Sequence, residues 1–178
     1  DATKPLFGLV SSLFYLDPLD HPENARILDE AISLVIGFGD CVIPQLVDNL
    51  DRGDLKAQMA AAAALGRFGA DAIKPLIEKY HSTDDPETHI FVLYALGKIK
   101  SPRLVTAVDL VLAGVESENL ELRDTAVRTM GCLAEAIPAT ELPPETARNF
   151  YDLLRQNLAY PNKGIRAKAM RSLGKLAA

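Results

Sequence analysis

The chain has 178 residues, of which 48% are hydrophobic, and its formal net charge at pH 7 is -5. This hydrophobic content is too high for an intrinsically disordered segment, and the acidic balance argues against a general nucleic-acid binder. The sequence has no Trp and only 6% aromatic residues, so it offers few platforms on which bases or sugars could stack.

The first predicted element is a helix within residues 6–16, LFGLVSSLFYL. Its apolar residues recur at steps of three and four, at Leu6, Leu9, Val10, Leu13 and Phe14, which is typical of one helix face. The stretch is too short to cross a bilayer, and we predict no membrane segment. Residues 1–17 resemble the second half of a two-helix unit, so we expect further chain or another molecule to cover this end.

The next segments repeat one another. Residues 35–50, VIGFGDCVIPQLVDNL, align with residues 65–80, LGRFGADAIKPLIEKY, with matching positions 30 apart. A glycine landmark then recurs at Gly66, Gly97, Gly131 and Gly174. Recurrence at intervals of this length indicates a helical-repeat architecture. We predict one repeat domain over residues 1–178, with a partial repeat at 1–17, repeats at about 22–53, 54–84, 85–118 and 119–160, and a partial repeat at 162–178.

Each unit is predicted to contain two helices. The first is rich in alanine and aliphatic residues, which favour helix and close packing. The second begins with a candidate N-cap, at Asp40, Asp71 or Ser101, and has proline in its first turn, at Pro44, Pro75 or Pro102. Asp85 before Pro86 is predicted to cap a first helix.

The stretch Gly66-Arg67-Phe68-Gly69 has the spelling of a phosphate-binding loop. A phosphate site requires accessible N–H groups with cationic support, and only Arg67 is near. We therefore interpret Gly66 and Gly69 as closing one helix and opening a tight turn.

The repeated pattern is Arg-x-x-Ala, then Leu-Gly-x-Leu/Phe-Gly, then Ile-x-Pro-Leu. It is carried by Arg123, Ala126 and Gly131; by Arg166, Ala169, Leu173 and Gly174; and by Ala61, Leu65, Gly66, Phe68, Gly69 and Leu76. In these residues the chain resembles HEAT-like repeats of the phycobilisome-lyase type. Two units depart from the pattern, with Gln58 and His89 where the family has Arg.

The resemblance implies an all-α, right-handed α-α superhelix, a HEAT-like solenoid, that binds proteins along a concave surface of second helices. Helical phase places the polar residues of these helices on that surface. The candidate protein-binding residues are Gln45, Asp48, Asn49, Lys74, Glu78, Lys79, Arg103, Thr106, Asp109, Asp152 and Arg155. Their mixed charge suits a protein partner more than a small apolar ligand.

Charge changes along the chain. Residues 1–53 have three basic and nine acidic side chains, whereas residues 119–178 have nine and six. Lys168, Arg171 and Lys175 form a basic C-terminal stripe on the last helix. The stripe is either a solvated face, a dock for an anionic partner, or a surface that meets the acidic end of a second copy.

No metal or cofactor is predicted. His81, Asp84, Asp85 and His89 are the nearest approach to a metal-ligand set, and we interpret them as exposed loop residues. Cys41 and Cys132 lie far apart without a C-x-x-C motif, which favours a reducing, cytoplasmic setting. Both thiols are expected to be buried.

Three hypotheses for function follow. The first is a non-catalytic scaffold or adaptor for another protein, favoured by the repeats and the lack of a catalytic set. The second, implied by the resemblance, is an auxiliary subunit of a bilin lyase or cofactor-attachment system, with Tyr94, His89 and Arg103 as the nearby set. The third, a nucleic-acid-acting enzyme, is disfavoured by the net charge.

Overall fold

The structure is a computed structural model that describes residues 3–17, 21–52 and 54–177. Within these ranges the chain forms helices and no strand, which confirms the predicted all-α class. The ends of three predicted repeat segments, at residues 1–2, 53 and 178, lie outside the described residues. Among the described residues, no helix has the length and apolar character needed to cross a membrane.

Ten α-helices are present in the described residues. They are α1 (Thr3–Ser11), α2 (Asn24–Gly37), α3 (Ile43–Asp48), α4 (Leu55–Phe68), α5 (Ile73–His81), α6 (Pro86–Leu96), α7 (Val108–Glu116), α8 (Leu120–Ala136), α9 (Pro144–Asn157) and α10 (Lys163–Leu176). Short 3₁₀ segments at Ser12–Tyr15, Asp40–Val42, Gly69–Ala72 and Pro102–Ala107 complete the regular structure.

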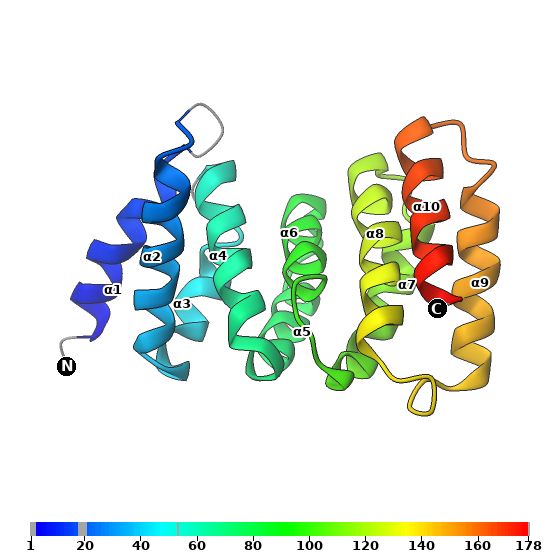
Figure 1. Cartoon of the computed structure of the whole chain (residues 1–178), viewed down its shortest axis with the longest axis horizontal. Coiled ribbons are helices and arrows are strands. Elements are labelled where there is room, and N and C mark those ends of the chain that lie inside the picture. The colour runs from blue at the N-terminus through cyan, green and yellow to red at the C-terminus, as the bar shows by residue number, and fades with distance from the viewer. Residues whose placement is uncertain (1–2, 18–20, 53, 178) are drawn as a thin grey trace.

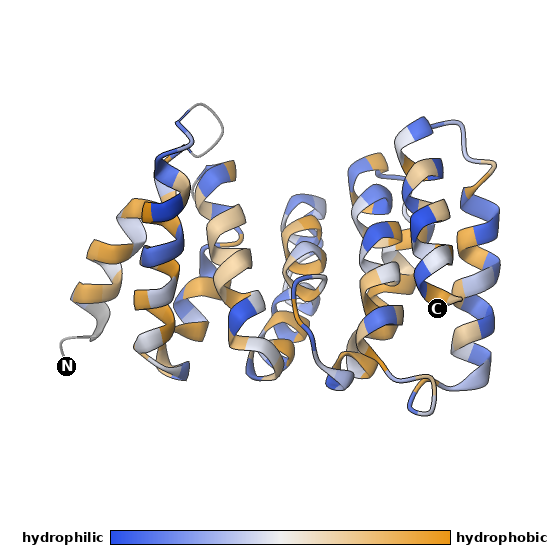
Figure 2. Cartoon of the chain, in the orientation of Figure 1, coloured by the Kyte–Doolittle hydropathy of each residue, from blue (hydrophilic) through white to orange (hydrophobic). Residues whose placement is uncertain are grey.

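The helices form two layers, as predicted for a solenoid. The first helices α2, α4, α6, α8 and α10 stand side by side in one row, with α3, α5 and α7 behind them (Figure 1). Alanine-rich α4 is apolar over its middle turns and has polar residues within its first and last turns (Figure 2). A continuous core that includes Phe14, Leu65, Leu93, Met130 and Phe150 runs between the layers.

Four first helices begin with the same capping arrangement. The side chains of Asp54, Asp85, Asn119 and Asn162 each accept a hydrogen bond from a backbone N–H in the first turn. Such caps satisfy donors that have no partner within the helix. The cap predicted at Asp85 is therefore confirmed, and the other three were not foreseen.

The residue four positions after each cap ties its helix to the preceding unit. These residues are Gln58, His89, Arg123 and Arg166, and each donates to a backbone carbonyl at or just after the end of the preceding second helix. Gln58 Nε2 lies 3.2 Å from the Leu50 oxygen, and His89 Nε2 lies 3.0 Å from that of Tyr80. The two departures from the family's Arg therefore keep the same hydrogen bond.

Replacing His89 tests this link. His89 Nε2 faces the carbonyls of both Tyr80 and Thr83, and its ring stacks on Tyr80 with centroids 3.8 Å apart. His89→Ala should lower the free energy of unfolding by about 1–3 kcal/mol, because partly buried carbonyls lose their donor. His89→Arg should retain most of the stability. Urea unfolding measures both, and equal losses in the two variants would contradict the link.

Successive first helices approach closely at the glycine landmarks. A Cβ atom built on Gly66 would lie 2.4 Å from Lys98 Cβ, and one on Gly131 would lie 2.8 Å from Ser172 Cα. The landmarks are thus packing positions between neighbouring units. Gly174, on α10, has no heavy atom within 4 Å of the equivalent point.

This difference predicts opposite effects of one substitution. Gly131→Ala should destabilise the chain by about 1–3 kcal/mol, because α8 and α10 must separate to admit the methyl group. Gly174→Ala adds the same methyl in open space and should be neutral or stabilising by up to about 1 kcal/mol from helix propensity. Thermal unfolding compares the two. A stable Gly131→Ala variant would show that the contact is not required.

The remaining local predictions for glycines and caps were right at two positions, Gly69 and Ser101, and wrong at three others. Gly69 ends α4 at φ +68, a backbone conformation that favours glycine, as expected, but Gly66 lies within the helix instead of closing it. Ser101 caps its segment through the Arg103 N–H. Asp40 and Asp71 do not cap, because each lies inside a 3₁₀ turn, not before a helix.

The two thiols differ in exposure. Cys132 is buried as predicted, whereas Cys41 is exposed, and its Sγ donates to the Phe38 carbonyl at 3.2 Å. The expectation for Cys41 failed because the residue falls on the outer side of the Asp40–Val42 turn, while Val42 points into the core.

Candidate partner-binding groove

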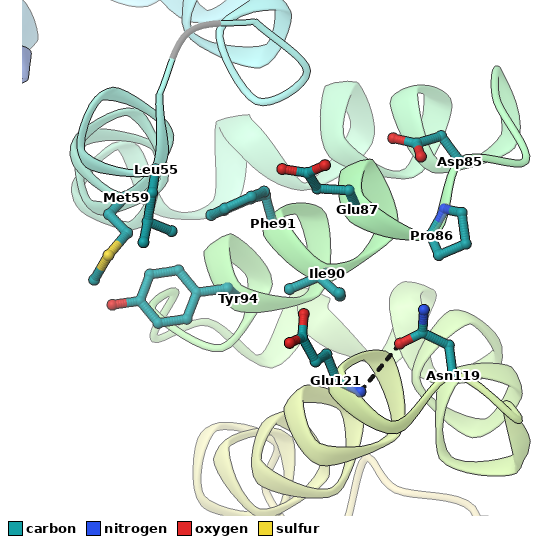
Figure 3. Close-up of a pocket in the computed structure, with 10 residues that line it drawn as sticks. All are labelled: Leu55, Met59, Asp85, Pro86, Glu87, Ile90, Phe91, Tyr94, Asn119 and Glu121. Carbon is teal, nitrogen blue, oxygen red and sulfur yellow. Dashed lines mark hydrogen bonds between the residues drawn. The ribbon is translucent and has the colours of Figure 1, made fainter.

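An apolar groove of about 550 Å³ lies between α4, α6 and the start of α8 (Figure 3). Its lining comes only from these helices and from the linkers that precede α6 and α8. The lining residues are Leu55, Met59, Asp85, Pro86, Glu87, Ile90, Phe91, Tyr94, Asn119 and Glu121.

The apolar part of the groove comes from two neighbouring helices. On α4, Leu55 and Met59 are spaced by four residues and are 61% and 44% exposed. On α6, Ile90 and Tyr94 have the same spacing and are partly exposed, with Phe91 buried between the helices. Residues four apart lie on one face of a helix, so the two pairs form parallel apolar stripes across the groove.

Carboxylates form the rim at the linker end of the groove. Glu87 and Glu121 lie in the first turns of α6 and α8, and Figure 3 shows them on opposite sides of Ile90. Neither forms an ion pair with a described residue. The third carboxylate, Asp85, accepts hydrogen bonds from the Thr88 hydroxyl at 2.6 Å and the Thr88 N–H at 2.9 Å.

These bonds lower the pKa of Asp85 below its ordinary value of 3.8, with the Thr88 hydroxyl as the main cause. Asp85 is therefore ionised at neutral pH and serves both as the cap of α6 and as a negative charge on the rim.

The cap should be visible in the pH dependence of stability. Because the folded pKa of Asp85 lies below the unfolded one, its ionised form contributes stability that is complete above pH 3.8 and is lost as the pH falls through the folded value. Asp85→Ala should cost about 1 kcal/mol at neutral pH, and the difference from the parent chain should shrink in acid. Urea unfolding at several pH values measures this. A difference that does not change with pH would contradict the assignment.

Cations mark the other end of the groove. Two cations contact the Tyr94 ring: Lys98 Nζ lies 5.0 Å from the ring centroid, and Arg128 Cζ lies 5.2 Å from it. Both contacts are of the cation–π type. The groove is therefore acidic at the linker end, apolar in the middle and basic beyond Tyr94.

The second-helix residues predicted for binding fall only partly together. Asp48, Glu78 and Lys79 line one groove of about 330 Å³ between α3 and α5, and Asp152 lines another between α7 and α9. The others line neither of these two grooves. They are Gln45, Asn49, Lys74, Arg103, Thr106, Asp109 and Arg155.

Several of these side chains already have partners within the chain. Lys79 Nζ lies 2.6 Å from Asp51 Oδ2, and its side chain is only 14% exposed. Lys74 pairs with Glu78 one turn along α5 at 3.8 Å. Thr106 donates to the Arg103 carbonyl. Lys79 thus holds α5 to the loop after α3 and is not available as a free charge.

The basic C-terminal stripe is largely neutralised. Lys168 pairs with Asp124, and Lys175 lies 2.8 Å from Glu135, both on α8. The Lys175 contact lowers the pKa of Glu135. Among the described residues, Arg171 has no carboxylate partner. Two of the three cations therefore join α10 to α8 instead of forming an outward stripe.

The residues considered for metal or tetrapyrrole binding do not converge. His89 is directed toward the end of α5, whereas Tyr94 faces the groove between first helices, and Arg103 does not line that groove. In the described part of the chain, no three His, Cys, Asp or Glu side chains are placed to hold a metal ion.

The comparison with protein families identifies the repeats. The family model of HEAT repeats matches residues 43–131, which is half of the chain. The chain belongs to the HEAT repeat family. No curated protein sequence matches it.

Solved structures with HEAT-like or armadillo-type helical repeats are similar to the chain. An engineered protein shares 22% identity over 95% of this chain, with a TM-score of 0.60, but the chain spans only 48% of its length. The complex of CpcE and CpcF of phycocyanin lyase from Nostoc sp. PCC7120 shares 18% identity over 77% of this chain and 79% of its own, with a TM-score of 0.61.

A designed armadillo repeat protein shares 17% identity over 94% of this chain and 80% of its own, with a TM-score of 0.56. At these identities, the likenesses establish the fold alone.

Proposed function

We propose that this HEAT repeat chain is a non-catalytic scaffold that binds another protein, with the groove between α4, α6 and α8 as its main contact surface. The observation that carries the proposal is the exposed apolar surface of the groove, formed by Leu55, Met59, Ile90 and Tyr94. Apolar side chains gathered in a hollow with a charged rim are typical of interaction sites, where a few anchors provide most of the affinity.

The chemistry of the groove supports binding more than catalysis. A general acid or base at neutral pH requires a pKa near 7, whereas the Asp85 carboxylate is used as a helix cap and has a lowered pKa. The repeat fold adds an extended surface on which a partner can contact several units at once.

A second candidate is an auxiliary subunit of a cofactor-attachment system. It is supported by the similarity to the CpcE and CpcF complex of phycocyanin lyase. Visible absorbance on mixing the chain with a free bilin separates the two proposals, because a scaffold without a tetrapyrrole site should leave the spectrum unchanged.

The scaffold proposal can be tested by selecting ligands from a library of short random peptides against the intact chain. Leu55→Ser/Met59→Ser should weaken binding of the selected peptides by about tenfold or more, as loss of anchor contacts does. Met170→Ser is the matched control, because Met170 is 68% exposed on α10, outside the groove, and it should bind as the parent chain does.

Failure to enrich any peptide would count against the scaffold function. Enriched peptides that bind Leu55→Ser/Met59→Ser as tightly as the parent chain would remove the groove as the contact surface. Circular dichroism and thermal unfolding of each variant ensure that lost binding is not lost folding.

A further inference from the structure

We infer that the groove recognises a protein segment in which a large apolar residue is flanked by Lys or Arg on the side that faces the linkers. This inference rests on the proposed function and adds the chemistry of the partner. It is argued from the charges on the rim, the placement of the carboxylates around the apolar floor, and the cations at the other end.

The two linkers beside the groove are acidic and contain no Lys or Arg. The nearest cation, Arg123, donates to the carbonyls of Glu116 and Ser117 and lines a different hollow, with Tyr160. The sequence has no Lys or Arg between Lys79 and Lys98, and none between Arg103 and Arg123. The two linkers and the helix turns that border them carry Asp84, Asp85, Glu87, Glu116, Glu118 and Glu121. One acid in a first turn is favoured by the helix dipole, but the dipole does not account for the missing cations on both linkers.

The carboxylates are placed to act together on one ligand. Glu87 belongs to α6 and Glu121 to α8, and both line the same hollow with Ile90 between them (Figure 3). A side chain seated on Ile90 and Met59 would therefore have a carboxylate on either side. A cation next to the apolar anchor satisfies this arrangement, and an acidic neighbour is repelled by it.

The far end of the groove gives the partner a direction. Lys98 and Arg128 both contact the Tyr94 ring there, so a basic residue at that end meets like charge. The basic flank of the partner is thus directed to the linker end, and the apolar anchor lies over the middle of the groove. Charge arranged in this way selects orientation and partner more than it adds affinity.

A charge reversal of the rim tests the inference. Short random peptides selected on the parent chain should combine a large apolar residue with Lys or Arg within a few positions. Glu87→Lys/Glu121→Lys should bind these peptides about tenfold more weakly and, in a fresh selection, should enrich Asp or Glu beside the apolar residue. Parent-chain binding should also weaken as salt is raised.

The matched control is Asp109→Lys/Glu145→Lys. Both positions are exposed acids in the first turn of a helix, α7 or α9, so the control repeats the charge change and its effect on the helix dipole away from the groove. It should keep the preference for basic flanks. Thermal unfolding of both double variants checks that each remains folded.

The outcomes separate the two levels of the proposal. If the selected peptides depend on Leu55 and Met59 but show no basic flank, or keep it with Glu87→Lys/Glu121→Lys, the partner chemistry is wrong and the scaffold function stands. If no peptide is enriched, or none depends on the groove, the proposed function fails with it. A switch to acidic flanks in the reversed variant alone supports the inference.

Discussion

The stacking of this protein depends on one side chain per repeat that donates to the last carbonyls of the unit before it. Carbonyls at the end of a helix have no partner within that helix, so the donor both satisfies them and fixes where the next unit begins. Gln58, His89, Arg123 and Arg166 meet this demand with three different side chains. The position requires a side-chain N–H that reaches these carbonyls, and the residue type can differ. The two units without Arg therefore depart from the family pattern in residue type but not in the hydrogen bond they form.

The sequence was sufficient to predict the helical repeats, because period and propensity are local properties that survive in every unit. It was less informative where the role of a residue depends on its backbone conformation or on a neighbour that is distant in the sequence. Asp40 and Asp71 have capping side chains, yet the backbone turns around them instead of starting a helix there. The role of Gly66 depends on Lys98, which is brought against it only by stacking.

The groove was missed for a related reason: its walls come from three units, and helical phase was applied to the second helices alone. Two signals were present in the sequence. Helix α6 is apolar on nearly every side, so Ile90 and Tyr94 remain outside after the core is filled, and two linkers lack Lys and Arg. The sequence also could not show that Lys168 and Lys175 on α10 pair with Asp124 and Glu135, because those carboxylates come from another helix.

The ties between repeats also bear on mechanics. Each donor joins only adjacent units, so a force pulling the two ends of the stack apart would act on all of these ties in series, with the same load on each. Rupture at the weakest tie would release one helical pair and leave the others folded. Extension would then proceed in steps, and each released pair could rejoin its neighbour when the tension falls. A stack built in this way behaves as a spring with discrete, recoverable stages.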